Sequence, residues 1–429
     1  MKIIGIDIGT TSICGIVVET DSGRLLKSLT KTNDSFMKSQ RAFEKIQDPA
    51  VIMRTVQELL SDLNVREAAA IGFSGQMHGV IYTDENGSAV SPLYTWQDER
   101  AALEYKNGKS YAQYIGCFAG YGTATDFYND INGEIPKNAK YFCTIADYAV
   151  MRLCELKKPL VHITNAASLG CFDIVNNRFT LDNPRIPDVT SKFEIAGKYN
   201  GIPVCVALGD NQASFIGSVS DCDDVLINVG TGSQISWLTD EPVNSNGIEA
   251  RPFDGKRYLA AGCALCGGRA FAVLEKLFRE IACLSGAEVE SMYPVIDKLL
   301  ADKSESSLVA DCRFCGTRSD PTVRGKISGI SESNFTAADL AYSVLCGMAN
   351  ELYDMYKNRS EAGKAVCSGN GIRKNAALRK IISEVFGIKI KIPFYSEEAS
   401  YGAALAASVA YGCFDDISAA CRMIKYAED

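Results

Sequence analysis

The stretch Ile3–Val18, IIGIDIGTTSICGIVV, consists of two apolar runs separated by a short polar turn. This pattern predicts a strand, a tight turn and a second strand. Gly9 permits a backbone with positive φ in the turn, and Thr10 and Thr11 add hydroxyl groups beside the amide N–H groups. A ring of such donors suits a polyphosphate. Asp7, just before the turn, is placed to hold Mg²⁺ through water.

The same design recurs near the middle of the chain, at Val225–Trp237, VLINVGTGSQISW. Gly230, Thr231 and Gly232 lie in the turn of this second copy. Asn228 occupies the position that an aspartate has in the first copy. Two matching hairpins indicate two related halves, and we expect a nucleotide to be held between them. Either copy alone would also be explained as an ordinary glycine-containing hairpin.

The composition is that of a large globular protein. The chain has 429 residues, 47% hydrophobic and 22% charged, which allows two or three domains with large cores. Its net charge of −8 argues against a nucleic acid or an anionic membrane as partner, since both attract basic surfaces. The N-terminus enters a strand without an export leader, and no apolar run approaches the roughly 20 residues of a membrane span. These features predict a cytoplasmic location.

Sixteen cysteines are scattered along the chain. Without an export leader, they are most simply reduced thiols that pack as small core residues. Two CxxC pairs, Cys263/Cys266 and Cys312/Cys315, raise the alternative of a zinc site. Their apolar, glycine-rich surroundings differ from those of zinc ribbons. With only two histidines, the chain also offers few members for a histidine-rich metal centre or a Ser-His-Asp hydrolase.

One predicted strand, Ala68–Ser74, runs into a loop that suits a small polar ligand. Ligands gather at such strand ends in open α/β sheets. In this loop Gln76 and His78 can hydrogen-bond hydroxyl groups, and Met77 can lie against a carbon chain. A histidine that is satisfied within a tight turn is the alternative.

A second loop, Thr95–Arg100 with the sequence TWQDER, has the composition of a polyol-binding surface. Trp96 offers an aromatic face for C–H groups, and Asp98 is one of several polar partners for hydroxyl groups. A solvated helix start is the alternative for this loop.

The candidate catalytic base lies at another strand end. Pro203–Leu208 predicts a strand that runs into Gly209–Asn211, GDN, before a predicted helix. Asp210 is placed there to accept a proton from an alcohol. An aspartate that only caps the helix is the alternative.

The acidic run Asp221–Asp224 marks the predicted domain boundary, with domains at residues 1–220 and 221–429. In the first domain, Gly116–Pro136 is rich in Gly, Tyr, Thr and Asn and shows little periodicity. We therefore expect a long loop or a small insertion there, which could cover a substrate pocket.

Glycine-rich turns in the second domain let a ligand approach the backbone. One of them contains Gly267 and opens a predicted helix. The other, Gly369–Asn375, can take an adenine or ribose edge, with Asn375 as the amide contact. A plain left-handed turn is the alternative for the second.

Taken together, these motifs resemble the FGGY family of carbohydrate kinases, whose α/β fold has two duplicated ribonuclease H-like (actin-like ATPase) domains with a cleft between them. The motifs are DIGTT (7–11), SGQMHG (74–79), TWQDER (95–100), GDN (209–211), GTGS (230–233), GNGIRKN (369–375) and EEASYGAAL (397–405). In this order they cover nearly the whole chain. Within the family they are most similar to sedoheptulokinases and next to xylulokinases.

The resemblance implies ATP-dependent phosphorylation of a terminal ketose hydroxyl, most simply sedoheptulose to sedoheptulose 7-phosphate, with xylulose or another ketose or polyol as the alternative. It assigns the sugar and the base to the N-terminal domain and the nucleotide to the C-terminal domain. Asp210 would be the base, and Asp7 and Asp210 would hold Mg²⁺. The residues implied to bind the sugar are Gln76, Met77, His78, Trp96, Asp98, Asp210 and Asn211. Those implied to lie along ATP are Gly9, Thr10, Thr11, Gly230, Thr231, Gly232, Gly267, Gly371 and Asn375.

Two hypotheses from other classes remain. A non-catalytic sugar or nucleotide sensor with the same fold could lose Asp7 or Asp210, so the presence of both argues against it. An ATPase that drives a partner protein would leave the Gln76–His78 and Trp96–Asp98 loops unexplained. The expected partner is a small ketose, and a homodimer is a further possibility.

Overall fold

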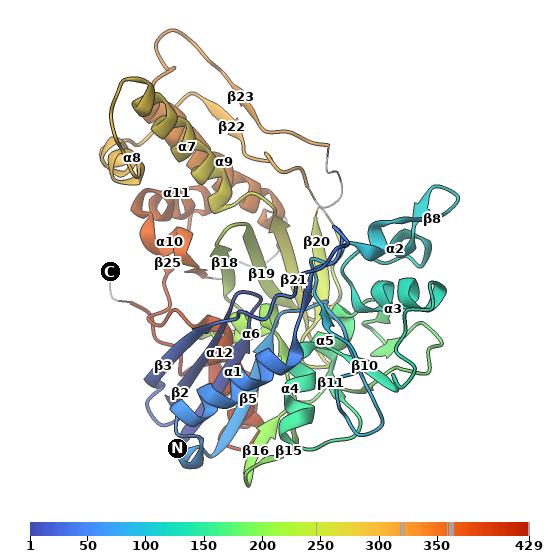
Figure 1. Ribbon diagram of the computed structural model, residues 1–429. Coiled ribbons are helices and arrows are strands. Elements are labelled where there is room, and N and C mark those ends of the chain that lie inside the picture. The colour runs from blue at the N-terminus through green and yellow to red at the C-terminus, as the bar shows by residue number, and fades with distance from the viewer. Residues whose placement is uncertain (246, 318–319, 321, 358, 360–363, 428–429) are drawn as a thin grey trace. The chain divides into compact units, whose positions relative to one another are not determined.

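The computed structural model describes residues 1–427 except 246, 318–319, 321, 358 and 360–363 (Figure 1). These residues group into two compact units. The first unit comprises Met1–Asp221, Arg251–Leu259 and Glu397–Lys425, and the second comprises Cys222–Ala250, Ala260–Ser396 and Tyr426–Asp429. Each unit is built around a mixed β-sheet with helices, which confirms the predicted α/β class. In the described part of the chain, helices are too short or too polar to cross a membrane.

A seven-stranded sheet forms the centre of the first unit. Its strands follow the order β15-β16-β5-β1-β2-β3, and β17 also pairs with β5. β1 (Lys2–Ile8) runs antiparallel to β2 (Ser12–Glu19) and parallel to β5 (Ala70–Gly75), so the predicted strand, turn and strand are confirmed. The other strands are β3 (Arg24–Thr32), β15 (Ile195–Tyr199), β16 (Ile202–Cys205) and β17 (Leu208–Gly209).

Helices cover both faces of this sheet. Ile4, Ile6 and Ile8 alternate along β1 and share a buried core with α1 (Pro49–Asp62) and α4 (Ile145–Leu153). Because successive side chains of a strand point to opposite faces, the intervening residues of β1 face the other layer. Proline at the start of α1 and an aspartate that caps it fix where this helix begins.

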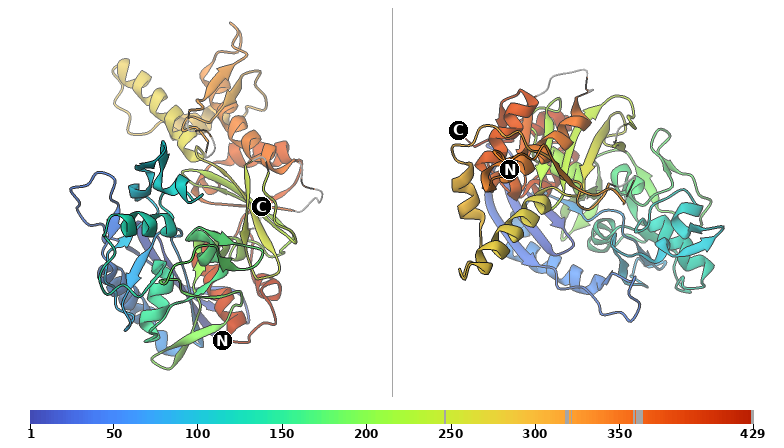
Figure 2. Two further views of the ribbon diagram at one scale, coloured as in Figure 1. Left: turned by 90° about the vertical axis from the view of Figure 1, so that its right-hand side faces the viewer. Right: turned by 90° about the horizontal axis from the view of Figure 1, so that it is seen from above.

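The second layer is α12 (Glu398–Ala410), drawn in red in Figures 1 and 2. It lies so close to the sheet that a Cβ atom on Gly5 would be 1.9 Å from the carbonyl oxygen of Ser400. Only small residues along the helix and glycines in the strands permit this approach. The contact places Glu397–Lys425 in the first unit, whereas the sequence assigned the whole of residues 221–429 to one domain.

Shorter elements complete the first unit. Its other helices are α2 (Tyr111–Tyr114), α3 (Gly122–Ile131), α5 (Ile163–Ser168), α6 (Asp210–Ile216) and α13 (Ile417–Cys421). Its short strands are β4 (Ile46–Gln47), β6 (Ile81–Thr83), β7 (Leu93–Tyr94), β8 (Glu104–Lys106), β9 (Lys109–Ser110), β10 (Tyr141–Cys143), β11 (Leu160–His162), β12 (Phe172–Asp173), β13 (Arg178–Phe179) and β14 (Asp188–Thr190).

Helix α3 lies within the stretch for which the sequence predicts a long loop or a small insertion, and the loop alternative is wrong for residues 122–131. The buried face of α3 is largely polar. Asp126 accepts a hydrogen bond from the hydroxyl of Tyr82 over 2.9 Å, and Asn129 accepts one from Arg100 over 2.8 Å. Because polar side chains fill this buried face, the sequence lacks the apolar periodicity of a helix.

The second unit repeats the central arrangement of the first. β18 (Val225–Val229) runs antiparallel to β19 (Ser233–Thr239) and parallel to β24 (Ala365–Ser368), as β1 does to β2 and β5. The full strand order is β20-β21-β19-β18-β24-β25. The remaining strands are β20 (Ile248–Pro252), β21 (Tyr258–Ala264), β25 (Ile390–Lys391) and the separate hairpin β22 (Val309–Asp311) and β23 (Lys326–Ser328). The end of β20 and the start of β21 belong to the segment Arg251–Leu259 of the first unit. The duplication read from the two hairpins is thus confirmed.

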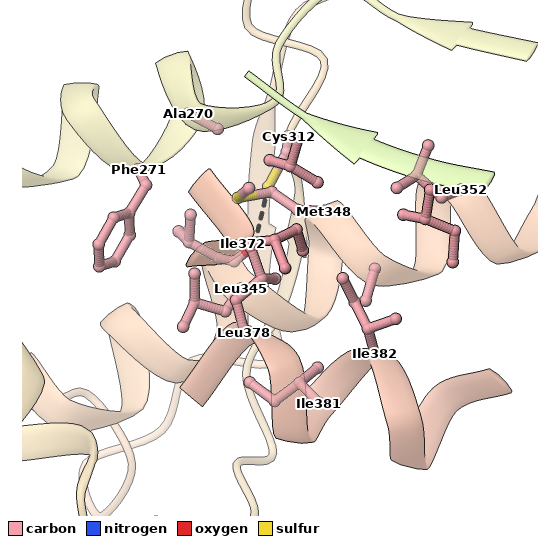
Figure 3. Packing of buried hydrophobic residues seen from close by; sticks show 14 of the residues in the cluster. Ala270, Phe271, Cys312, Leu345, Met348, Leu352, Ile372, Leu378, Ile381 and Ile382 are labelled. Atoms are coloured by element: carbon pink, nitrogen blue, oxygen red, sulfur yellow. Dashed lines mark hydrogen bonds between the residues drawn. The ribbon is translucent and has the colours of Figure 1, made fainter. Parts of the chain in front are cut away.

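The core of the second unit lies between its helices and this sheet. Its helices are α7 (Gly268–Leu284), α8 (Tyr293–Leu300), α9 (Ala337–Tyr356), α10 (Asn370–Lys374) and α11 (Ala376–Phe386). Figure 3 shows Leu345 and Met348 of α9 in one buried cluster with Ile372 of α10 and Leu378 of α11. This cluster continues to Phe271 of α7. Phe271 also lines a cavity in the second unit.

Candidate active site

Three strand ends of the first unit bring the predicted aspartates to one edge of its sheet. Asp7 of β1 is in register with Ser74 of β5, and the Ser74 hydroxyl donates a hydrogen bond to Asp7 Oδ1 over 2.8 Å. Leu208 of β17 pairs with Ser74 in the parallel direction, and Asp210 is the first residue of α6. Because carboxyl ends of parallel strands meet at one edge, this topology explains why residues far apart in sequence converge.

The electrostatics of this edge are unusual. Burial raises the pKa of Asp210 from 3.8 to about 7, and the negative charge of Asp7 raises it as well. Arg251 and the backbone N–H of Asn211 oppose that rise. Burial also raises the pKa of Asp7, against the hydrogen bond from Ser74. Two desolvated carboxylates that destabilise each other's charge are groups that a divalent cation would neutralise.

These two carboxylates fit Mg²⁺, which is typically bound by one or two carboxylates together with phosphate oxygens and water. Among the residues that the structure describes, His, Cys, Asp and Glu form no group of three or more suited to a metal ion. A magnesium site at Asp7 and Asp210 therefore depends on ligands from a bound phosphate and from water.

Arg251 is a site residue that the sequence did not indicate. Its Nη1 donates a hydrogen bond to Oδ1 of Asn211 over 2.9 Å, beside Asp210. The neighbouring backbone is held by Gln212, whose Nε2 donates to the carbonyl oxygen of Pro252 over 3.1 Å. No motif surrounds Arg251, and the contact spans 40 residues of sequence, so local patterns gave no signal for it.

Thr10 joins three of the predicted motifs. Nε1 of Trp96 donates to the Thr10 hydroxyl over 3.0 Å, and that hydroxyl donates to Oε1 of Gln76 over 3.2 Å. Gln76 Nε2 donates to Gln47 Oε1, and Gln47 Nε2 donates to the Thr10 carbonyl oxygen, each over 2.8 Å. The amide of Gln76 is therefore bound to protein groups, and Gln47 is a member of this network that the sequence did not reveal. Trp96 remains 47% exposed, which leaves part of its ring accessible.

His78 is held in a strained and defined orientation. Its φ of 72° lies in the left-handed region, which is uncommon for a residue other than glycine. Its Nδ1 lies 2.9 Å from the carbonyl oxygen of Ser168. Since a carbonyl oxygen can only accept, Nδ1 carries the proton and Nε2 of the neutral ring is an acceptor. The ring stacks on Tyr121 with centroids 4.2 Å apart. Strain of this kind clusters at functional sites.

Asp98 and Met77 have partners within the protein. Asp98 is 1% exposed, and its Oδ1 accepts a hydrogen bond from Nε of Arg100 over 2.7 Å. Its Oδ2 accepts one from the backbone N–H of Lys45 over 3.1 Å. Met77 is buried against Gly209, where a Cβ atom would lie 2.9 Å from its sulfur. Both residues fix loops that surround the candidate site.

Gly9 does not adopt the positive φ that the turn sequence suggested. The turn needs glycine there for a steric reason, because a Cβ atom would lie 2.9 Å from the carbonyl oxygen of Ser12. The carbonyl oxygen of Gly9 accepts a hydrogen bond from Asn33 over 2.8 Å. Thr11, at the tip of the turn, is exposed.

The second unit contains a cavity of about 780 Å³, within the range of roughly 300–1,000 Å³ that is usual for ligand sites. It is lined by four of the residues predicted to lie along the nucleotide, Gly230, Thr231, Gly371 and Asn375. Gly268, Arg269 and Lys374 also line it, and they belong to the two glycine-rich turns that the sequence indicated. The wall is completed by residues that the sequence did not suggest, among them Phe271, Tyr293, Asp297, Leu345, Met348 and Leu378. Aromatic and aliphatic walls with two cationic side chains suit a base, a ribose and phosphates.

Gly267 and Gly232 contact each other instead of lining this cavity. A Cβ atom on Gly267 would lie 2.4 Å from the carbonyl carbon of Gly232. The next amide, that of Gly268, donates to the carbonyl oxygen of Gly230 over 2.9 Å. The glycines thus let the start of α7 pack on the turn. Asn375 caps α11, where its Oδ1 accepts a hydrogen bond from a backbone amide over 2.8 Å.

The four cysteines of the CxxC pairs do not share one site. Cys263 donates to Oε1 of Gln234 over 3.8 Å, and Cys312 donates to the carbonyl oxygen of Val344 over 3.3 Å. The sulfur atoms of Cys266 and Cys315, one from each pair, lie 3.8 Å apart.

Comparisons with known proteins identify the family and the fold. Residues 2–191 match the N-terminal domain of the FGGY family of carbohydrate kinases, and residues 225–411 match its C-terminal domain. The sedoheptulokinase of Mus musculus is 26% identical over 465 residues, which cover 94% of this chain and 96% of the relative. A xylulose kinase of Staphylococcus epidermidis is 24% identical over 464 residues, covering 97% and 89%. The crystal structure of xylulose kinase from Lactobacillus acidophilus, 20% identical, has a TM-score of 0.84 and a similar fold over 100% of this chain and 93% of its own.

Proposed function

Because the chain belongs to the FGGY family of carbohydrate kinases, we propose that it transfers the γ-phosphoryl group of ATP to a terminal hydroxyl of a ketose, with sedoheptulose as the substrate. The observation that carries this proposal is the buried carboxylate of Asp210 beside Asp7 at the strand ends of the first unit. Sedoheptulose is favoured because the mouse sedoheptulokinase matches over nearly the full length of both chains.

Asp210 is the proposed base. Its carboxylate accepts the proton of the acceptor hydroxyl while the hydroxyl oxygen bonds to the γ-phosphorus, and the bond from that phosphorus to the bridging oxygen breaks so that ADP leaves. Burial brings the pKa of Asp210 to about 7, near the neutral pH at which a general base works best, and a Mg²⁺ ion held beside it would lower that pKa. Arg251, which favours the ionised form, limits how far burial raises this pKa. Bound Mg²⁺ would be held by Asp7 and Asp210 and would neutralise charge on the phosphates.

The sugar is proposed to bind in the first unit beside this base. Nε2 of His78 accepts a hydrogen bond from one hydroxyl, and the exposed face of Trp96 takes a C–H face of the chain. Asn211, oriented by Arg251, contacts a hydroxyl next to the reacting one. Gln76, Met77 and Asp98 act mainly by positioning these loops, because their side chains already have partners in the protein.

ATP is proposed to bind in the cavity of the second unit. The Gly230–Gly232 turn and Gly371 let phosphates approach the backbone, and Lys374 and Arg269 supply positive charge. Phe271 and Tyr293, whose ring centroids lie 5.6 Å apart, contact the base. That Gly9, Thr10 and Thr11 of the first unit also bind phosphate stays a prediction from the sequence.

A coupled assay of ADP release tests this function. We expect turnover with sedoheptulose, slower turnover with xylulose or ribulose, and a background near that without sugar for glycerol. A higher kcat/KM for xylulose would assign the chain to the alternative that the Staphylococcus epidermidis relative represents. ATP turnover that ignores every sugar would indicate an ATPase, and sugar binding without ADP release would indicate a sensor. The homodimer stays a prediction, which sedimentation equilibrium would check.

A further inference from the structure

Two cysteines from the separate CxxC pairs meet beside the nucleotide cavity. Cys266 lies just before α7 and is 2% exposed, whereas Cys315, in the loop after β22, is partly exposed. Their sulfur atoms are 3.8 Å apart, which is van der Waals contact. Nη1 of Arg269 donates a hydrogen bond to the Cys315 sulfur over 3.4 Å. The pair therefore combines an accessible sulfur, a cation beside it and a second sulfur within reach.

We propose that Cys266 and Cys315 form a reversible disulfide when the protein reacts with a hydroperoxide, and that this disulfide weakens nucleotide binding in the adjoining cavity. The first part rests only on the thiol geometry. The second part rests on the proposed function, since it assumes that the cavity binds ATP.

Cys315 is the sulfur that reacts first. The hydrogen bond from Arg269 lowers its pKa, so more of it is present as thiolate, whereas burial raises the pKa of Cys266 to about 11. The Cys315 thiolate attacks a peroxide oxygen and becomes a sulfenic acid, while the O–O bond breaks and the peroxide leaves as an alkoxide or hydroxide. The Cys266 sulfur then attacks the sulfenic sulfur, and its proton leaves with the hydroxyl group as water. A thiol reductant reverses the bond by exchange.

The consequence for the nucleotide follows from the neighbours of Cys266. Closing the sulfur separation from 3.8 Å to a bond of about 2.05 Å requires one sulfur or both to move. Gly267, the next residue, is packed on Gly232 without space for a methyl group, and Gly268 hydrogen-bonds to Gly230. A displacement of Cys266 is therefore passed directly to the turn that lines the cavity.

Arg269 adds a second link between the thiols and the cavity. Its side chain contacts Cys315, its backbone N–H donates to the carbonyl oxygen of Thr231 over 3.0 Å, and the residue lines the cavity. Oxidation removes the thiolate that holds the guanidinium. If the guanidinium of Arg269, no longer held there, loses its charge-assisted contact to a phosphate of ATP, ATP binds roughly tenfold more weakly.

Peptide mapping after treatment of the full chain with hydrogen peroxide tests the disulfide itself. Trypsin releases Cys315 in the peptide 314–318 and Cys266 in the peptide 258–269, which also contains Cys263. We expect these two peptides to be linked, with fragment ions that assign the bond to Cys266. The Cys263→Ser variant should retain the link, and both Cys266→Ser and Cys315→Ser should lose it. Absence of the link in the wild type, or its persistence in either of the last two variants, would overturn the proposal.

ATP binding measured by calorimetry tests the consequence. The oxidised wild type should bind ATP about tenfold more weakly than the reduced protein, and dithiothreitol should restore the affinity. Cys315→Ser, with a thiol replaced by a hydroxyl, should bind ATP equally with and without peroxide. A linked protein with unchanged ATP affinity would refute the second part. If the reduced wild type binds no ATP, the proposed nucleotide site fails, while the peptide map still decides the disulfide.

Discussion

Replacement of Asp210 by Asn should lower the catalytic rate and raise the stability of the fold. The amide keeps the size of the side chain but cannot accept the acceptor's proton as a carboxylate does. Loss of a general base typically costs about 10²–10⁴ in rate. We expect kcat in the ADP-release assay to fall by about 10³, with the affinity for ATP changed less than about threefold, because the nucleotide cavity is formed by other residues.

The same substitution should stabilise the fold at alkaline pH. The folded protein raises the pKa of Asp210 from 3.8 to about 7, so the folded state binds this proton more tightly than the unfolded state. Ionisation of Asp210 therefore does not lower the free energy of unfolding below about pH 4. Between pH 4 and 7 it lowers this free energy progressively, and above pH 7 the loss is constant. The full difference in pKa corresponds to about 4 kcal/mol. Because Asp210 is only partly buried, solvent screening reduces the expected effect to about 2 kcal/mol.

Chemical unfolding of both proteins at pH 4 and pH 8, without Mg²⁺, measures this effect. Asp210→Asn should be more stable than the wild type at pH 8 and equally stable at pH 4. Asp147→Asn is the matched control, since burial also raises the pKa of Asp147 to about 7. Asp147 also accepts hydrogen bonds from Thr144 and Asn165, so at pH 4 its replacement should lower stability by about 1 kcal/mol. At pH 8 the removal of a buried charge should offset that loss, and turnover should persist at both pH values. Turnover by Asp210→Asn within tenfold of the wild type would refute the role of Asp210 as base.

Three further substitutions test the sugar loop, the nucleotide turn and the packing of α12. His78→Asn should raise the KM for the ketose about tenfold and leave the KM for ATP unchanged in steady-state assays, because Asn tolerates the left-handed backbone but lacks the imidazole acceptor. Gly230→Ala should melt like the wild type, since the nearest atom to its Cβ is 3.9 Å away, yet bind ATP about tenfold more weakly in calorimetry because the methyl group enters the cavity. Gly5→Ala should lower the free energy of unfolding by about 3 kcal/mol or more in urea titrations, because its Cβ would meet the Ser400 carbonyl at 1.9 Å.

Predictions that depend on local sequence agree with the structure. The two hairpins and the helix that begins at Asp210 are set by apolar runs, turn residues and the chain direction over a few positions. The strand predicted over Pro203–Leu208 is interrupted, because the structure divides it into β16 and β17. The meeting of Asp7 with Ser74 follows once both strands are parallel neighbours. Each of these features is determined by residues that are close to it in the sequence, so a pattern of a few residues is enough to predict it.

Features that depend on distant contacts could not be predicted in this way. Arg251 reaches Asn211 from a segment without a motif. The CxxC spacing directed attention to Cys266 and Cys315 separately, whereas the contact joins one cysteine of each pair across 49 residues. Asp98 looked available for a sugar, but the carboxylate is paired with an arginine two residues later. In each case the partner of a polar side chain decides its role, and one sequence does not identify that partner.

The duplication also explains how two similar units come to have different tasks. In the first unit Ser74 donates to Asp7, and at the matching positions of the second unit Asn228 donates to Ser368, again over 2.8 Å. The backbone plan is the same, but a carboxylate has become an amide. A carboxylate attracts a cation and repels a polyphosphate, whereas an amide adds no charge beside the Gly230–Gly232 turn. In the proposed function, this change of charge at one strand end would favour the first unit for Mg²⁺ and the acceptor, and the second unit for the phosphates of the nucleotide.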